Sequence, residues 1–411
     1  MSALDFLKMS IKEAKRLPVI ERIIDKQLRQ VEGARLLELS TRQIRRLTER
    51  VRDEGVKGII HRSRGRASNR EIANGTKEQV LRLCREVYSG FGPTLASEKL
   101  LERDGIRVSA ETLRLWLIEA QIPYERRKGR PHRQWRERKR CYGEMVQIDG
   151  SHHDWLEGRG SPIVLMGYID DATGRAFGRF YGYEGTLPAL DSFERYVRRN
   201  GLPQSVYLDK HTTYRSTAKP TLEDELRNRW PQSQFERAMT ELGVKAIHAN
   251  SPQAKGRIER LFRTFQDRLI KEMRLEKVGN LEEANRLLRW YLPKHNRRFS
   301  VPAAVTGDVH RPVSGEINLG AILCIREDRV VRNDYTVMYK GRFYQIDERI
   351  GGKKVAMEEG WAGKIGIRYQ GRMLRYRSIL PHKPQSTPKI RWHRRSAHTP
   401  ARNHPWRVSY K

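Results

Sequence analysis

The chain has 411 residues, and its 82 lysines and arginines outnumber its 49 aspartates and glutamates by 33, which predicts a polyanionic partner. Its 37% of hydrophobic residues and its 32 glycines are ordinary for globular domains and argue against a disordered basic protein. We expect a cytoplasmic protein without membrane contact, because the most hydrophobic window, 162–169, is too short to cross a bilayer and the first residues lack a secretion signal.

The first predicted domain, residues 1–60, contains helices joined by a tight turn. Apolar residues recur at helical spacing on both sides of this turn, and Ser40 or Thr41 can cap the second helix. Glu38 stands in the turn, where a small residue is usual. Any short helical hairpin gives this pattern, but a basic outward face favours a helix-turn-helix that enters the major groove of DNA. The residues of that face expected to contact DNA are Arg42, Gln43, Arg45 and Arg46.

Two basic segments flank the next predicted domain. Residues 61–70 are rich in arginine, serine and glycine and indicate a basic linker. Residues 71–124 repeat the helical pattern, with Ser109 as a cap, and predict a second helix-turn-helix domain. The segment 125–141 follows as another basic linker. It is either a solvated helix or an arm that follows DNA phosphates, and its charge density beside two candidate DNA-binding domains favours the arm.

From Tyr142 the pattern changes to strand-like runs that alternate with helices. A short strand ends at Asp149, and a hairpin over 162–183 turns at 171–174. This alternation continues to residue 303 and predicts a domain with a mixed sheet flanked by helices. The tryptophans expected in its core are Trp155, Trp230 and Trp290. The further strands are expected over 205–209 and 245–249, and the helices over 187–201, 235–243 and 256–275.

The last predicted domain, residues 318–380, consists of short strand-like segments separated by glycines or charged turns. We expect a small β-barrel there, with a sandwich as the alternative. The tail, 381–411, is basic, contains no acid and is expected to be disordered and available to DNA. The predicted fold class is therefore multidomain: helical modules, then an α/β core, then a small β domain.

Three acids stand where the α/β domain can use them for chemistry. Asp149 and Asp209 each end a predicted strand, and Glu259 lies one turn into the long basic helix. Carboxylates that converge at one sheet edge repel one another unless divalent cations are present, and hard oxygen ligands favour Mg²⁺, with Mn²⁺ as the alternative. Two such ions can activate an attacking oxygen and stabilise a leaving oxygen at phosphorus. The pattern therefore predicts phosphodiester cleavage or exchange.

Each acid also has a structural explanation. A single aspartate at a strand end often only starts a turn, and Glu259 can pair with Arg263 one turn later. It is the order and the setting of the three together that favour catalysis. Lys255 and Arg257, which flank Glu259, are expected either to hold the reacting phosphate or to be solvated.

Neighbouring polar residues have simpler explanations. The adjacent histidines His152 and His153 point to opposite faces if they lie in a strand, and a solvated turn explains them best. Asp170 and Asp171 are interpreted as turn formers.

Four segments resemble the catalytic core of retroviral integrases and bacterial insertion-sequence transposases, the DDE recombinases with a ribonuclease H-like fold. They are QIDGSHHDWLEGRG, YIDDATGRAFGRFY, VYLDKHTTYR and HANSPQAKGRIERLFRTFQDRL. The resemblance is strongest over 142–300. In the order of its predicted domains, the chain is similar to the ISNCY-type transposases. It implies that Asp149, Asp209 and Glu259 bind two Mg²⁺ ions and catalyse strand cleavage and strand transfer.

The same resemblance implies the partners. Terminal inverted repeats of the element would be the specific ligand and target DNA the less specific one, in a homo-oligomer on the DNA of a bacterial nucleoid. The chain departs from the viral pattern in two ways. It has a longer gap between Asp209 and Glu259, attributed to the polar segment 215–232, and it lacks the His and Cys set that precedes viral cores. The second difference, with helix-turn-helix modules in place of that set, favours a bacterial transposase over a viral integrase.

Two rival functions stay open at this point. A DNA-binding regulator with an inactive core would bind without catalysis, but the intact acids argue against it. A structure-specific nuclease of the same fold would cleave without joining strands, but paired recognition domains favour binding of element ends.

Overall fold

The computed structural model describes residues 9–64, 72–124, 136–220, 222–226, 230–249 and 255–379. Clustering of contacts divides the chain into two compact units, 1–124 and 125–411. Three predicted features lie partly or wholly outside the described residues: the basic linker after His61, the first part of the basic arm, and the tail. No helix in the described ranges is long and apolar enough to cross a membrane.

The N-terminal unit begins with a three-helix module that contains the predicted helix-turn-helix. Ile20, Ile23 and Ile44 are buried between its helices. Glu38 ends the second helix in the left-handed conformation (φ 53°), which explains why a small residue was expected there. Ser40 caps the third helix by accepting a hydrogen bond from the Gln43 amide, as predicted. The elements are α1 (Ile11–Ile24), α2 (Gln30–Leu37), α3 (Thr41–Glu54) and the 3-10 helix η1 (Gly55–Ile59).

The second module of this unit also consists of three helices. Leu100, Leu113 and Leu117 are buried in it, and Ser109 caps the last helix, as predicted. The elements are α4 (Asn74–Glu86), α5 (Pro93–Asp104) and α6 (Ala110–Glu119).

The second unit is built around a mixed five-stranded sheet in the order β3-β2-β1-β4-β5. Strands β2 and β3 form the predicted hairpin, and β2 pairs antiparallel with β1, whereas β1, β4 and β5 run parallel. Parallel strands need crossover connections, which the helices after β3 and β4 supply. The strands are β1 (Met145–His152), β2 (Val164–Asp170), β3 (Ala176–Tyr181), β4 (Ser205–Leu208) and β5 (Lys245–His248).

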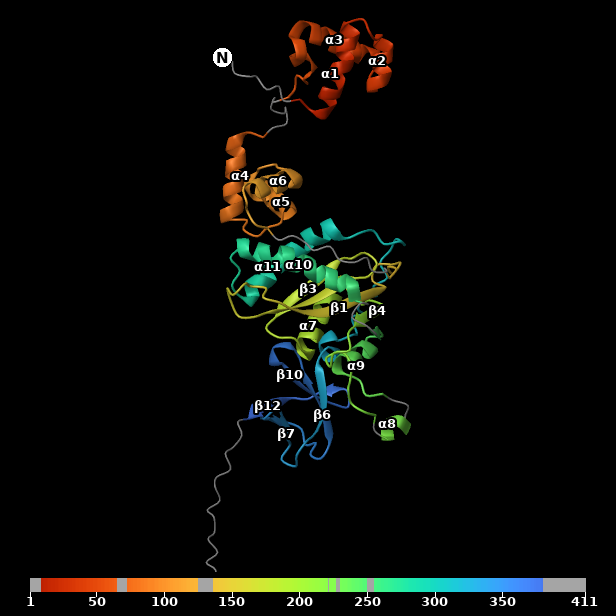
Figure 1. Ribbon diagram of the computed structural model, residues 1–411. Coiled ribbons are helices and arrows are strands. Elements are labelled where there is room, and N and C mark those ends of the chain that lie inside the picture. Colours follow the sequence, from red (N-terminus) through yellow and green to blue (C-terminus); the bar gives the residue numbers. More distant parts are fainter. Residues whose placement is uncertain are drawn as a thin grey trace, which may run out of the picture. The chain divides into compact units, whose positions relative to one another are not determined.

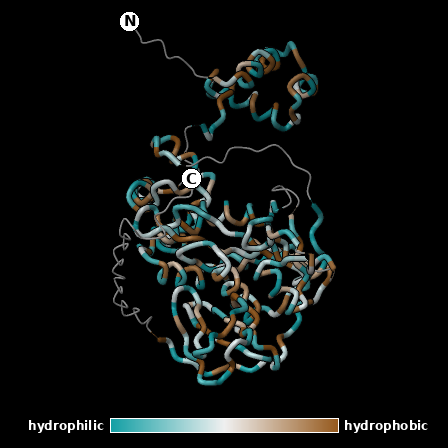
Figure 2. Tube along the Cα trace, turned by 90° about the horizontal axis from the view of Figure 1, so that it is seen from below, coloured by the Kyte–Doolittle hydropathy of each residue, from teal (hydrophilic) through white to brown (hydrophobic). Residues whose placement is uncertain are grey.

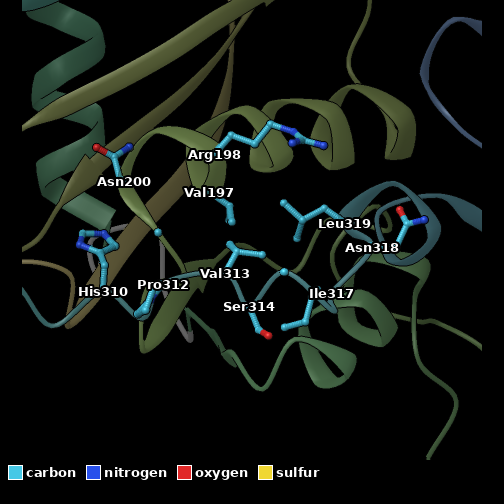
Figure 3. A pocket seen from close by; sticks show the side chains of 12 residues that line it. Val197, Arg198, Asn200, His310, Pro312, Val313, Ser314, Ile317, Asn318 and Leu319 are labelled. Carbon is cyan, nitrogen blue, oxygen red and sulfur yellow. The ribbon is translucent and has the colours of Figure 1, made fainter.

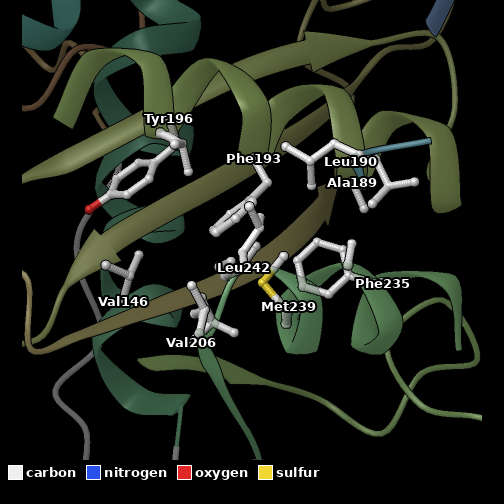
Figure 4. Packing of buried hydrophobic residues seen from close by; sticks show 14 of the residues in the cluster. Val146, Ala189, Leu190, Phe193, Tyr196, Val206, Phe235, Met239 and Leu242 are labelled. Atoms are coloured by element: carbon white, nitrogen blue, oxygen red, sulfur yellow. The ribbon is translucent and has the colours of Figure 1, made fainter. Parts of the chain in front are cut away.

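Helices cover both faces of this sheet (Figure 1). On one face, α7 and α9 pack on Val146 and Ile148 of β1, and Figure 4 shows Phe193 of α7 among these side chains. On the other face, α10 and α11 pack on Leu165 of β2. Figure 2 shows hydrophobic stretches interspersed with hydrophilic ones along the tube. The helices are α7 (Thr186–Asn200), α8 (Leu222–Leu226), α9 (Gln234–Glu241), α10 (Gly256–Leu275) and α11 (Leu281–Phe299).

Strand β1 is longer than predicted. The sequence analysis ended it at Asp149, but it continues to His152 because Gly150, Ser151 and His152 pair with β2. The interpretation of His152 as part of a solvated turn was therefore wrong. Of the three tryptophans predicted in the core, Trp155 is buried, but Trp230 and Trp290 are 75% and 49% exposed.

The C-terminal region forms two antiparallel sheets that share one apolar core, with Val337 and Tyr344 from one sheet and Val355 and Met357 from the other. The predicted small β-barrel is therefore not found as a closed barrel among the described strands, which separate into orders β11-β10-β9-β6 and β12-β8-β7. The elements are α12 (Leu319–Ile322), β6 (Ile325–Val330), β7 (Thr336–Tyr339), β8 (Arg342–Ile346), β9 (Lys354–Glu359), η3 (Trp361–Gly363), β10 (Ile365–Tyr369), β11 (Arg372–Met373) and β12 (Tyr376–Ile379).

This β domain is docked on the α7 and α9 side of the core. Trp361 meets Tyr181 edge-on, with ring centroids 5.0 Å apart. Arg237 of α9 donates to the carbonyls of Ile322 and Cys324, at 3.0 and 2.6 Å. The docking therefore combines an aromatic contact with charge-assisted hydrogen bonds.

Candidate active site

Asp149 and Asp209 are neighbours because their strands are parallel neighbours. The register pairs Val146 of β1 with Val206 of β4, and the two aspartates each follow three residues later. Asp149 lies within β1, whereas Asp209 follows the last residue of β4. Two acids far apart in the sequence thus come to adjacent positions at one edge of the sheet.

The electrostatics of Asp149 agree with this placement. Burial raises the pKa of its carboxyl group, the Lys255 ammonium opposes this rise, and the negative charges of Asp209 and Glu184 add to it. Asp149 therefore lies close enough to two other carboxylates to be repelled by them, and the Lys255 ammonium opposes this repulsion.

Helix α10 brings Glu259 to the same side of the sheet. The Ile258 amide donates to Gln147 of β1 at 3.3 Å, and Gln266 donates to Ser151 of β1 at 3.4 Å. Glu259 and Gln266 are seven residues apart and therefore share one edge of the sheet-facing side of the helix.

Glu259 does not form a closed ligand set with the two aspartates. Within the described ranges, no three His, Cys, Asp or Glu side chains lie close enough together to hold a metal ion. Residues 250–254, immediately before this helix, lie outside those ranges.

The two cations predicted to hold phosphate are both paired with buried or half-buried carboxylates. Lys255 is 5% exposed, and its Nζ lies 3.0 Å from Asp149 Oδ1. The Arg257 guanidinium lies 2.8 Å from Asp171 Oδ1. Their contact with DNA stays a prediction, and in this structure both groups hold the start of α10 to the sheet.

Glu184 is a residue that the sequence analysis missed. It follows β3, pairs with His152 at 2.5 Å and is largely buried. Gly150 makes room for it, because a Cβ atom there would lie 2.5 Å from the Glu184 carboxyl group. No motif marks Glu184, and only the hairpin geometry brings it beside Asp149.

The residues of the predicted recognition helix are placed for contact with a ligand. Arg42, Gln43, Arg45 and Arg46 of α3 are exposed, while Ile44 and Thr48 face the module core. In the second module, by contrast, Arg114 of α6 is held by Glu111 through two hydrogen bonds, at 2.8 and 2.6 Å.

A pocket of about 690 Å³ lies away from the acids, between the end of α7 and the segment before α12 (Figure 3). His310 at its edge is held by Tyr196, whose hydroxyl is 2.7 Å from Nε2, and by Asp308, 2.5 Å from Nδ1. These contacts secure the connection to the β domain, and none of the three predicted catalytic acids lines the pocket.

Comparison with solved structures finds viral integrases at low similarity. The HTLV-2 integrase catalytic core domain, in complex with magnesium, is 15% identical with a TM-score of 0.28 over 36% of this chain and 84% of that chain. The simian T-cell lymphotropic virus intasome in complex with PP2A regulatory subunit B56 gamma is 14% identical with a TM-score of 0.32 over 74% of this chain and 99% of that chain.

Comparison of sequences finds two bacterial relatives, while no protein-family model matches the chain. A protein of Sinorhizobium fredii that carries the name transposase y4bF is 38% identical over 378 residues, which are 90% of this chain and 82% of the relative. The transposase for insertion sequence IS1202 of Streptococcus pneumoniae is 27% identical, over 97% of this chain and 94% of the relative. These matches run through the helical modules, the mixed-sheet core and the β domain, and the chain belongs to the insertion-sequence transposases.

Proposed function

We propose that this transposase binds the terminal inverted repeats of its element and joins them to target DNA at a centre formed by Asp149, Asp209 and Glu259, on a ribonuclease H-like core. The observation that carries the proposal is the parallel register of β1 and β4, which sets the two aspartates side by side. Glu259, in the first turn of α10, would complete the centre when its side chain turns toward the two aspartates on binding DNA.

The donor set fits hard divalent cations. Carboxylate oxygens suit Mg²⁺ or Mn²⁺ better than softer metals. Tyr214 supports this fit: its hydroxyl is fully buried without a hydrogen-bond partner in the described part of the chain, and Asp149, Asp209 and Glu184 all raise its pKa, after the larger effect of burial. A buried hydroxyl beside carboxylates needs a partner such as an ordered water.

Two bound Mg²⁺ ions would activate the attacking oxygen and stabilise the leaving oxygen at the phosphorus. Asp149 and Asp209 would hold the ions from the sheet edge and Glu259 from the helix. Lys255 would exchange its contact with Asp149 for one with the DNA phosphate, and Arg257 would hold the start of the helix and add positive charge beside the backbone.

The helical modules would supply recognition. Arg42, Gln43, Arg45 and Arg46 of α3 would contact base edges and phosphates in the major groove. Two ends must be joined together, so we propose a homo-oligomer on the DNA, acting in the cytoplasm at the nucleoid.

A strand-transfer assay with an oligonucleotide that carries the element's end tests the proposal. We expect joining in Mg²⁺ by the unaltered protein and none by Asp149→Asn, Asp209→Asn or Glu259→Gln, with end binding retained. Asp267→Asn, on the same helix, is the matched control and should join normally. Cleavage without joining would support a nuclease, and full joining by all three variants would contradict the proposed centre.

A further inference from the structure

Asp171 is the most heavily engaged acid of the core, although its position in a hairpin turn suggested only a turn former. Its side chain is fully buried. Oδ1 accepts hydrogen bonds from Gln147 and Arg257, both at 2.8 Å, and from Arg136, while Oδ2 accepts from the Lys139 amide at 2.8 Å. A turn needs none of these partners. Asp170 alone forms the turn, by accepting from the Thr173 amide and hydroxyl, both at 2.7 Å.

The partners of Asp171 converge on the first turn of α10. Arg257 belongs to that turn, and Gln147 uses its carbonyl oxygen to accept from the Ile258 amide. Asp171 therefore holds two consecutive residues of the helix, one directly and one through Gln147. Glu259 is the next residue.

Asp171 compensates positive charges that lie close together at the start of α10. Burial lowers the pKa of Arg257, Asp171 opposes this, and the nearby Arg136 and Arg138 add to the lowering. Without Asp171, at least two arginines would lie close together with no compensating carboxylate. A buried charge that loses its partner is strongly destabilising where it sits. The first turn of α10 would then be held by Ile258 and by the pair of Lys255 with Asp149, whereas several apolar side chains, among them Leu261, Phe265 and Leu269, hold the rest of the helix.

We propose that Asp171 is a positioning residue for strand transfer: it holds the first turn of α10 against β1, and so sets the distance of Glu259 from Asp149. This inference rests on the proposed function for the role of Glu259. Arg136 shares the same carboxylate oxygen, and its own carbonyl accepts from Arg257 at 2.7 Å. The end of the basic arm is therefore joined to the start of the catalytic helix.

Hydrogen exchange of the full-length protein without metal, followed by mass spectrometry, tests this contact independently of activity. In Asp171→Asn, peptides over 256–262 should exchange about tenfold faster or more, because a charge-assisted hydrogen bond is removed. Asp170→Asn is the matched control, a buried neighbour that should loosen the turn at 171–174 and the backbone at Gly143, its hydrogen-bond partners, but not α10. Arg257→Gln should reproduce the effect on α10, and combining it with Asp171→Asn should add nothing further.

Strand transfer supplies the second measurement. Asp171→Asn should lower the joining rate on the order of 10²-fold, as a displacement of about 1 Å does, and raise the half-saturating Mg²⁺ concentration while leaving that for the DNA end unchanged. The inference is overturned if α10 exchanges at the original rate in Asp171→Asn, or if Asp170→Asn affects α10 equally. If the unaltered protein joins no ends, the proposed function fails, and the exchange experiment still decides the contact of Asp171.

Discussion

Gly167 offers a way to displace α10 without altering any acid. Gly167 lies in β2 directly opposite Asp149 of β1, and Phe262 of α10 packs on it. A Cβ atom at position 167 would lie 2.4 Å from Cε1 and 2.9 Å from Cζ of the Phe262 ring. Carbon atoms in contact lie about 3.5–4.0 Å apart. Because the ring is buried among apolar neighbours, Gly167→Ala must push ring and helix away by about 1 Å.

This displacement should have two measurable effects. Overpacking of this kind lowers the free energy of unfolding by about 1–3 kcal/mol. Misplacing a reacting group by about 1 Å costs on the order of 10²-fold in rate. We therefore expect Gly167→Ala to join element ends about 10²-fold more slowly, while it binds them with unchanged affinity.

The controls separate displacement from general damage. Gly182→Ala adds the same methyl group near β3, where no atom lies within 4 Å of the new Cβ, and should keep full activity. Phe262→Leu removes the clashing ring atoms and should restore part of the activity when combined with Gly167→Ala. Joining at the original rate by Gly167→Ala alone would refute the reasoning that links α10 to the reaction.

Three further predictions concern other parts of the chain. Burial lowers the pKa of His295 to about 4, and its Nδ1 has no partner in the described part of the chain. The unfolded state therefore binds more protons between about pH 6.5 and 4, and the free energy of unfolding falls by about 3 kcal/mol as the pH drops through that window. His295→Leu should remove this loss when denaturation is measured at pH 7 and at pH 4. Trp361→Ala should release the β domain, seen as faster proteolysis of 311–325, whereas Trp290→Ala, at an exposed position, should not. The double variant Arg45→Ala, Arg46→Ala should bind element ends more weakly, and the slope of log affinity against log salt concentration should fall by about 1 for each phosphate group that is no longer bound. Arg114→Ala, whose guanidinium is held by Glu111, should leave the affinity and this slope unchanged.

The sequence predicted local features better than those that depend on distant partners. Periodicity and capping located the hairpin of β2 and β3 and the helix that begins near Gly256. The end of β1 was missed because its last residues, Gly150, Ser151 and His152, do not continue the apolar run and are placed in the strand by pairing with β2. The two β sheets were predicted as one barrel because strand segments alone do not specify which edges pair.

For the same reason, only part of the candidate site could be predicted from the sequence. Asp149 and Asp209 could be proposed because each follows a short apolar, strand-like run that is visible in the sequence. Asp171 and Glu184 could not, since their side-chain partners lie 24 to 86 residues away along the chain. Asp170 and Asp171 were both interpreted as turn formers because they stand at the hairpin, but it is the Asp170 side chain that accepts the hydrogen bonds of the turn.

Anomalous diffraction from crystals of the protein bound to an element end and soaked in Mn²⁺ tests the reaction centre most directly. The account predicts two peaks about 3.5–4 Å apart, held by the carboxylates of Asp149, Asp209 and Glu259. A complex with DNA in place but no peak between the two aspartates, or with Glu259 out of contact with both ions, would contradict it.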